Sequence, residues 1–245
     1  MPLDLLAAKL SKCRSRRFVI HSDLTIFGRA IPKYKGVAIK SFRQKLDAEV
    51  LAIPTFNLNT NSSSIIDFSM LDASMGSLPT EAISALKDTD GFRLPNPIHS
   101  YTFFPSVDGL EKIDCGKSFG TNSVFDYFYE KDFYWVEFGT SHGDGLTIFH
   151  HLECIAAVPY REKIFFDRVV IYNKRKYTVT YEYYAKKNNA YVTNFSRALK
   201  YLTDNKIVTK ISHGNRNIFV GNVKEISISI LTQLNSDPYF LVEKI

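Results

Sequence analysis

The stretch that decides the fold is Phe18-Val19-Ile20-His21-Ser22-Asp23-Leu24. Its first three residues favour a short buried strand, and polar residues follow where that strand ends. Residues 36–48 then have apolar positions at helical spacing, and Val50-Leu51-Ala52-Ile53 is a second apolar run. A strand, a helix and a strand in this order predict a parallel pair with a right-handed crossover, so we expect an α/β protein.

The remaining pattern extends this unit along the chain. Further helices are expected over residues 3–13, 76–88, 124–130, 194–204 and 224–235, and strands over 101–104 and 133–139. After Pro159 the pattern changes to hairpins, expected at 165–172 with 177–184 and at 207–211 with 216–220. We therefore predict a central mixed, largely parallel sheet flanked by helices, with a β-hairpin-rich C-terminal part packed on it. One domain is expected over residues 1–245, with a core and catalytic motif in 1–158 and hairpins and helices in 159–245.

Composition narrows the classes of partner. The 31 basic and 25 acidic residues give a formal charge of +6, and the basic clusters are scattered. No nucleic-acid fold signature accompanies them, so we expect no nucleic-acid partner but attraction for a phosphorylated small molecule. No run approaches the roughly 20 apolar residues of a spanning helix, and the first residues do not resemble a signal peptide. We expect a cytoplasmic protein without membrane insertion, and the sequence leaves oligomerisation open.

The three cysteines, Cys13, Cys115 and Cys154, argue against two kinds of chemistry. Their odd number and the absence of a C-x-x-C pair favour neither disulfides nor a zinc site, and we expect no metal. A cysteine nucleophile needs an adjacent base and a lowered pKa, for which the sequence offers no sign.

The sequence Thr147-Ile148-Phe149-His150-His151-Leu152-Glu153 contains the strongest candidate for catalysis. In a helix, His150 and Glu153 lie three residues apart and face the same side. A carboxylate beside an imidazole fixes one tautomer, which suits a general base acting near neutral pH. A lone His-x-x-Glu is more often an ordinary helix start, so this interpretation depends on other motifs.

Those other motifs occur in order along the chain and resemble the aminoglycoside 3-N-acetyltransferase family. The segments similar to the family's motifs are His21-Ser22-Asp23-Leu24, Ile53-Pro54-Thr55-Phe56, Met75-Gly76-Ser77-Leu78-Pro79, Asn96-Pro97-Ile98-His99-Ser100, Phe119-Gly120-Thr121-Asn122-Ser123, and Asp144 through Glu153. Asn96 stands where the family usually has His, Asp23 where it has Ser, and Leu146 where it has Asn. Asn96 and Asp23 lie at strand ends that are expected to face the ligand, so these two departures concern the acceptor. The chemistry is expected to be kept, because His150 and Glu153 are both present.

The resemblance implies transfer of an acetyl group from acetyl-coenzyme A to an amine of a sugar. It implies His150 as the base, Glu153 as its orienting partner, and the Thr147 backbone N–H as the oxyanion donor, although Thr147 is also a plausible N-cap. Hydroxyls at strand ends and helix starts are candidates for holding the cofactor, and each is as well explained as a cap: Ser22, Ser100, Thr121 and Ser123. Candidates for contact with the acceptor are His21, Asp23, His99, His142 and Asp144, of which His99 is better explained as a cap. His151 is expected to be structural.

Three functions fit these residues. A nucleotide-linked amino sugar, used in surface polysaccharide biosynthesis, suits the basic balance better than a polycationic aminoglycoside, which calls for a carboxylate-lined cleft. Antibiotic resistance through aminoglycoside 3-N-acetylation is the alternative. A non-catalytic binding protein on the same fold is the third, and the presence of both His150 and Glu153 argues against it.

Overall fold

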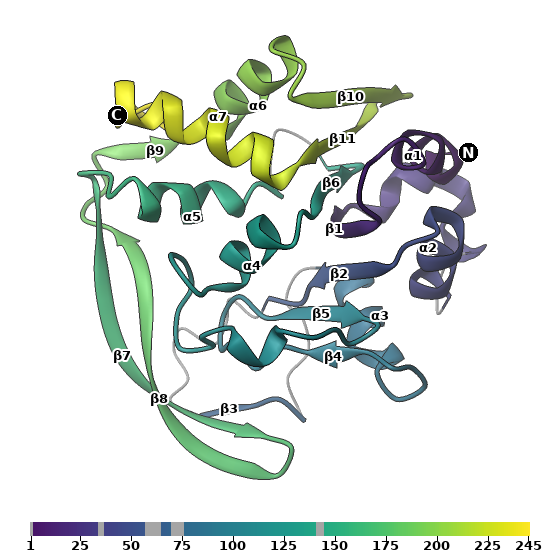
Figure 1. Ribbon diagram of the computed structural model, residues 1–245, viewed down its shortest axis with the longest axis horizontal. Helices are drawn as coiled ribbons and strands as arrows, with labels where there is room; N and C mark the ends of the chain where they lie inside the picture. Colours follow the sequence, from purple (N-terminus) through teal and green to yellow (C-terminus); the bar gives the residue numbers. More distant parts are fainter. Residues whose placement is uncertain (1, 34–36, 57–64, 70–75, 141–144) are drawn as a thin grey trace.

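A seven-stranded sheet of order β10-β11-β6-β1-β2-β5-β4 lies at the centre of the computed structural model (Figure 1). The structure describes residues 2–33, 37–56, 65–69, 76–140 and 145–245. The middle strands are β1 (Arg17–Ser22), β2 (Val50–Pro54) and β6 (Tyr134–Phe138). Both neighbours of β1 run parallel to it. The parallel pair predicted from the first strand-helix-strand unit is therefore confirmed.

The outer strands of this sheet are antiparallel to their neighbours. They are β5 (Tyr101–Phe104) and β4 (Phe92–Arg93) beside β2, and β11 (Arg216–Asn222) and β10 (Val208–His213) beside β6. The sheet is mixed, as predicted, but its parallel part is limited to the three middle strands. Short return connections join β4 to β5 and β10 to β11, and such connections make neighbouring strands antiparallel.

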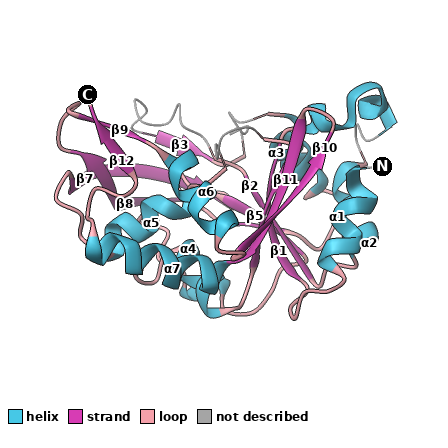
Figure 2. Ribbon diagram, turned by 90° about the horizontal axis from the view of Figure 1, so that it is seen from above, coloured by secondary structure: helices cyan, strands magenta, loops and turns pink. Residues whose placement is uncertain are grey.

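Helices cover both faces of the sheet (Figure 2). One face carries α1 (Pro2–Leu10), α2 (Ala38–Leu46) and α3 (Ser77–Ala85). The other carries α4 (Val124–Glu130), α5 (Ile148–Ile155), α6 (Phe195–Asp204) and α7 (Val223–Ser236). The short 3-10 segments η1 (Leu24–Lys33) and η3 (Leu110–Lys112) lie in connections. No helix in the described part of the chain is long and apolar enough to cross a membrane.

Alternation along the strands produces two hydrophobic cores. On β1, Phe18 and Ile20 belong to the cluster under α1–α3, whereas Val19 belongs to the cluster under α4–α7. Side chains alternate across a strand, so an uninterrupted apolar run such as this one is buried on both faces. On α2, Ile39 and Phe42 repeat at helical spacing and are buried against the first face.

A long hairpin runs along one side of the molecule (Figure 1). It consists of β7 (Arg161–Tyr172) and β8 (Arg175–Lys186), and β3 (Ile65–Asp67) pairs with β7 to make a three-stranded sheet. The turn contains only Asn173 and Lys174, with φ of 51° and 63°, so it is tighter than the expected join at 173–176. The buried Tyr181 hydroxyl donates to Asn96 Oδ1 at 2.7 Å, which fastens the hairpin to the body.

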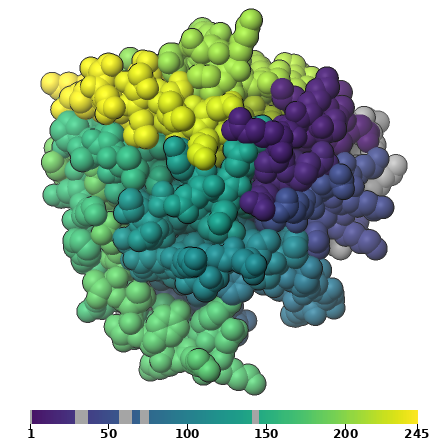
Figure 3. All heavy atoms as spheres, in the orientation of Figure 1, coloured from purple at the N-terminus to yellow at the C-terminus, as the bar shows by residue number. Residues whose placement is uncertain are grey.

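The C-terminal segments complete the main sheet and its helical layer. The β10–β11 hairpin extends the sheet beside β6, and α7 packs against α4 and α5. Figure 3 shows α7 beside the N-terminal segment. Arg14 joins the two through an ion pair of 3.1 Å to Glu225, and a second pair of 3.0 Å ties it to Asp132, which follows α4. A separate two-stranded sheet pairs β9 (Tyr191–Thr193) with β12 (Val242–Lys244).

Candidate active site

The start of α5 is fixed by contacts between Gly145 and the sheet. Trp135 Nε1 donates to the Gly145 carbonyl at 3.3 Å, and the Gly145 N–H donates to Glu137 Oε1 at 3.1 Å. A Cβ at position 145 would lie 2.7 Å from the Cβ of His21, so this close approach requires glycine. The helix therefore begins at the edge where β1 and β6 end, which is where open α/β sheets bind ligands.

Helix α5 brings His150 and Glu153 together as the spacing predicts. Phe149 and Leu152 anchor the helix in the core, which leaves His150 partly exposed and Glu153 inside. The side chain of His150 is 26% exposed and that of Glu153 is 0% exposed. His150 Nδ1 lies 2.6 Å from Glu153 Oε2. With a carboxylate at this distance, Nδ1 carries the hydrogen, and Nε2 keeps a lone pair for a substrate proton.

Two neighbours of Glu153 were not predicted. Arg161 Nε lies 2.7 Å from Glu153 Oε2, and the Tyr160 hydroxyl donates to Glu153 Oε1 at 2.7 Å. Arg161 also places Nη2 3.0 Å from His150 Nδ1 and donates through Nη1 to the Tyr184 carbonyl at 3.1 Å. Both oxygens of the carboxylate are therefore held, and the imidazole lies against the same guanidinium. No spacing rule pairs Glu153 with residues seven and eight positions later.

The cluster keeps Glu153 ionised. Burial raises the pKa of this carboxyl, but the His150 hydrogen bond, the charges of His150 and Arg161, and the Tyr160 hydrogen bond outweigh it and lower the pKa below its ordinary value. Burial and the Glu153 charge both raise the pKa of Tyr160, so its hydroxyl remains a donor. A buried carboxylate with three partners is suited to orienting an imidazole, and the arrangement can accept a proton at Nε2.

A comparison with protein-family models shows to which family the chain belongs. The model for aminoglycoside 3-N-acetyltransferase matches residues 96–231, which include the whole cluster around Glu153. The chain belongs to the aminoglycoside 3-N-acetyltransferase family. Members of this family are acyltransferases, and the predicted resemblance and enzyme class are confirmed.

Several solved structures share this fold. AAC-IIIb in a binary complex with CoASH is 14% identical with a TM-score of 0.73, covering 96% of this chain and 95% of that one. A variant of aminoglycoside acetyltransferase AAC(3)-IVa in complex with gentamicin is 16% identical with a TM-score of 0.69, covering 98% and 89%. The YokD protein from Bacillus subtilis is 13% identical with a TM-score of 0.72, covering 97% and 93%. A search of curated proteins finds no match.

The motif His21-Ser22-Asp23-Leu24, at the end of β1, is buried in part. Burial lowers the pKa of His21 to about 3, so this imidazole is neutral and lies among Phe56 and Tyr101. Asp23 accepts from the Thr25 N–H at 2.9 Å and pairs with Arg216 at 3.0 Å. Ser22 differs, because its shielded hydroxyl has no hydrogen-bond partner among the described residues.

Two hydroxyls predicted to hold the cofactor, those of Ser100 and Ser123, point inward instead, which corrects their assignment as cofactor contacts. Ser100 is 1% exposed, donates to the Leu94 carbonyl at 2.8 Å and accepts from Thr55 at 3.2 Å. Ser123 is fully buried and caps α4 by accepting from the Asp126 N–H. Both hydroxyls are therefore occupied by protein groups. This agrees with the alternative that the sequence left open, in which each serine is a structural cap.

Asn96, predicted to face the ligand, is likewise internal. It is 1% exposed, and its Oδ1 accepts from Tyr181 and from the backbone N–H groups of Ile98 and His99. Its Nδ2 donates to the Lys117 carbonyl at 2.8 Å. Protein groups thus occupy the whole side-chain amide of Asn96. Asn96, which stands where the family usually has His, therefore stabilises this turn.

The remaining predicted residues divide between core and surface. His99 is packed against Phe119, with ring centres 4.8 Å apart, and burial followed by the charge of His150 lowers its pKa to about 3. His151 is structural as expected, because its Nδ1 accepts from the Gly120 N–H at 3.2 Å. Thr121 is exposed in the loop before α4. His142 and Asp144 lie outside the described residues, which contain no group of side chains suited to a metal ion.

Proposed function

We propose that the protein transfers an acetyl group from acetyl-coenzyme A to the amine of an amino sugar, with His150 as the general base. The cluster of His150, Glu153, Arg161 and Tyr160 at the ligand edge of a family fold carries this proposal. A buried, ionised carboxylate that orients an imidazole is the arrangement that amine acylation needs.

The chemical step follows from the positions of these groups. The neutral amine attacks the thioester carbonyl, so a C–N bond forms and the C–S bond breaks. His150 Nε2 takes the amine proton and passes it to the departing sulfur, which leaves as the thiol. Thr147 is the N-cap residue of α5, and helix starts present unpaired N–H groups. Its N–H is the donor proposed for the developing oxyanion.

Two hydroxyls are the proposed contacts of the donor. The Ser22 hydroxyl is without a partner among the described residues at the end of β1, and Thr121 is exposed just before α4. Hydroxyl and N–H groups at such positions suit pantetheine amides and phosphates.

The charges near His150 favour an acceptor that carries phosphate. Glu153, beside His150, and Asp23, at the end of β1, are already paired with Arg161 and Arg216. A polycation needs free carboxylates, whereas a nucleotide-linked amino sugar brings its own negative charge. We therefore favour a sugar nucleotide, of the kind used to build surface polysaccharides. An aminoglycoside is the second candidate, because a solved structure of this fold holds gentamicin.

A screen for released thiol tests the proposal. Acetyl-coenzyme A would be incubated with amino-sugar nucleotides, free amino sugars and aminoglycosides, and we expect thiol release that depends on the acceptor and is fastest with a sugar nucleotide. Titration of coenzyme A by calorimetry is the control for a correctly folded donor site. Heat of coenzyme A binding without thiol release from any acceptor would contradict the acceptor class. Absence of binding would contradict the enzyme itself.

A further inference from the structure

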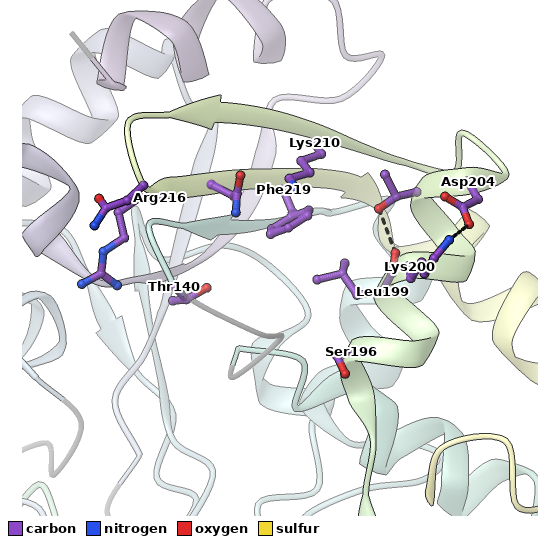
Figure 4. A pocket seen from close by; sticks show the side chains of 11 residues that line it. Thr140, Ser196, Leu199, Lys200, Asp204, Lys210, Arg216 and Phe219 are labelled. Carbon is purple, nitrogen blue, oxygen red and sulfur yellow. Dashed lines mark hydrogen bonds and ion pairs between the residues drawn. The ribbon is translucent and has the colours of Figure 1, made fainter.

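A cavity of about 610 Å³ lies between α6 and the β10–β11 hairpin (Figure 4). Lys200 and Asp204 lie at one end, Arg216 and Thr140 at the other, and Phe219 between them. The cavity thus offers charged side chains at the rim and an aromatic side chain in its middle.

The cavity adjoins the catalytic base through α6. Phe195, the first residue of α6, packs against His150 with ring centres 5.0 Å apart, and Ser196 lines the cavity. On the other side of the site, Phe119 contacts the same imidazole at 5.8 Å and precedes Thr121, the proposed donor contact. The segment that contains Phe119 thus connects His150 with the proposed donor contact, and the start of α6 connects it with this cavity.

The side chains lining the cavity are mainly cationic. Among the described lining residues there are three cations, Lys200, Lys210 and Arg216, and one carboxylate, Asp204. Lys200 pairs with Asp204, while Lys210 is exposed and forms no ion pair within the described part of the chain. Arg216 pairs at 3.0 Å with Asp23, whose carboxylate moderates the charge at that end. An anion gains from this balance, whereas a polycation meets repulsion.

Thr140 supplies an independent sign that a ligand belongs here. It lines the cavity just after β6, and its Oγ1 is shielded from solvent. No described residue forms a hydrogen bond with this hydroxyl. Leaving a shielded hydroxyl without a partner is unfavourable, and a ligand oxygen that accepts from it would offset this cost.

We propose that this cavity is the acceptor's phosphate subsite, which binds the diphosphate of a nucleotide-linked amino sugar. Lys210 and Lys200 meet the phosphate charge, Thr140 donates a hydrogen bond, and the sugar amine extends along α6 toward His150. The inference rests on the proposed function, because it assigns the phosphate to the acceptor and not to coenzyme A.

Binding of inorganic pyrophosphate to the whole protein tests the subsite without catalysis. We expect Lys210→Gln to raise the Kd by about threefold, and Lys200→Gln with Lys210→Gln to raise it by about tenfold. Asp204→Asn should lower the Kd, since it removes the one carboxylate of the lining. Lys112→Gln, at an exposed lysine outside the cavity, is the matched control. An unchanged Kd in the double variant, or an equal change in the control, would overturn the subsite.

Two further measurements separate the donor from the acceptor. Saturating coenzyme A should leave pyrophosphate binding in place, and complete displacement would overturn the assignment to the acceptor. With UDP-glucosamine and free glucosamine as paired acceptors, the double variant should reduce the advantage in KM of the nucleotide form. Failure of both acceptors, with pyrophosphate binding still lost in the double variant, would reject the proposed function and keep the anion site.

Discussion

The two polar regions beside His150 are built in opposite ways. The region around Glu153 is closed, with the carboxylate fully buried and both of its oxygens in contact with other side chains. The cavity beside α6 is open, and the side chains of Lys200 and Asp204 are 76% and 58% exposed. Buried charges depend strongly on their partners, whereas exposed pairs contribute little. In the proposed function the closed region holds the base, and the open one can change its acceptor without disturbing it.

The largest expected effect comes from the closed region. His150→Ala should lower turnover by about 10²–10⁴-fold, the usual loss for a general base, because it removes the imidazole that Glu153 orients. Thermal unfolding and coenzyme A calorimetry should be close to wild type, since His150 is partly exposed. Turnover equal to that of the wild type would remove His150 from the mechanism.

Breaking the buried ion pair should be the most damaging to stability. Arg161→Met leaves Glu153 without its cation, and we expect the free energy of unfolding to fall by about 3–5 kcal/mol in urea titrations. Arg161→Lys restores the charge but not the contacts of a planar guanidinium, so it should recover part of the stability and less of kcat. If Arg161 merely supports the fold, kcat and stability should recover together in Arg161→Lys.

The buried histidines should make the protein sensitive to acid. The pKa of His99 is lowered from an ordinary 6.5 to about 3, mainly by burial and to a smaller extent by the charge of His150. Between these values the unfolded chain binds a proton that the folded chain does not, so stability falls as pH drops below 6.5. One such group lowers the free energy of unfolding by about 2 kcal/mol between pH 7 and pH 5. His99→Leu should reduce that drop by this amount in urea titrations, and His213→Gln is the comparison variant.

The smallest effect concerns a single hydrogen bond. Tyr160→Phe removes the donor to Glu153 Oε1 while Arg161 still holds Oε2, and we expect a loss of about 1–2 kcal/mol in unfolding free energy. The KM for acetyl-coenzyme A should hardly move, because the change lies behind the base. A large rise in that KM would place Tyr160 at the donor site.

The sequence predicts the parts that depend on local spacing. The parallel pair of β1 and β2 follows from two apolar runs around a helical segment, and the contact of His150 with Glu153 follows from helical geometry. Arg161 could not be predicted in this way. Helix α5 ends at Ile155, and Ala157, with φ of 50°, lies where the chain turns to bring Arg161 back to Glu153. That reversal is a tertiary feature, since alanine rarely adopts this conformation and gives no sign of it.

The direction of polar side chains at the sheet edge was also beyond prediction. Ser22 and Ser100 both adjoin short apolar strands, yet the Ser22 hydroxyl is unpartnered within the described structure and the Ser100 hydroxyl is bonded inside. The length of a strand of four to six residues indicates that its ends reach the edge of the sheet. It does not indicate where a terminal side chain points, because both faces of this sheet are buried. Only the packed neighbours decide which hydroxyls remain available.

The position of β6 has a consequence for biosynthesis. One edge of this aromatic strand pairs with β1, and the other pairs only with β11, where Ile218 lies opposite Phe138. On the ribosome, β11 emerges long after β6, so one edge of the hydrophobic strand β6 remains unpaired until β11 has been synthesised. Such edges invite association with other chains. The hairpin that borders the phosphate cavity thus also covers this edge of β6, and a nascent chain gains its acceptor side and the partner of its aromatic strand in one step.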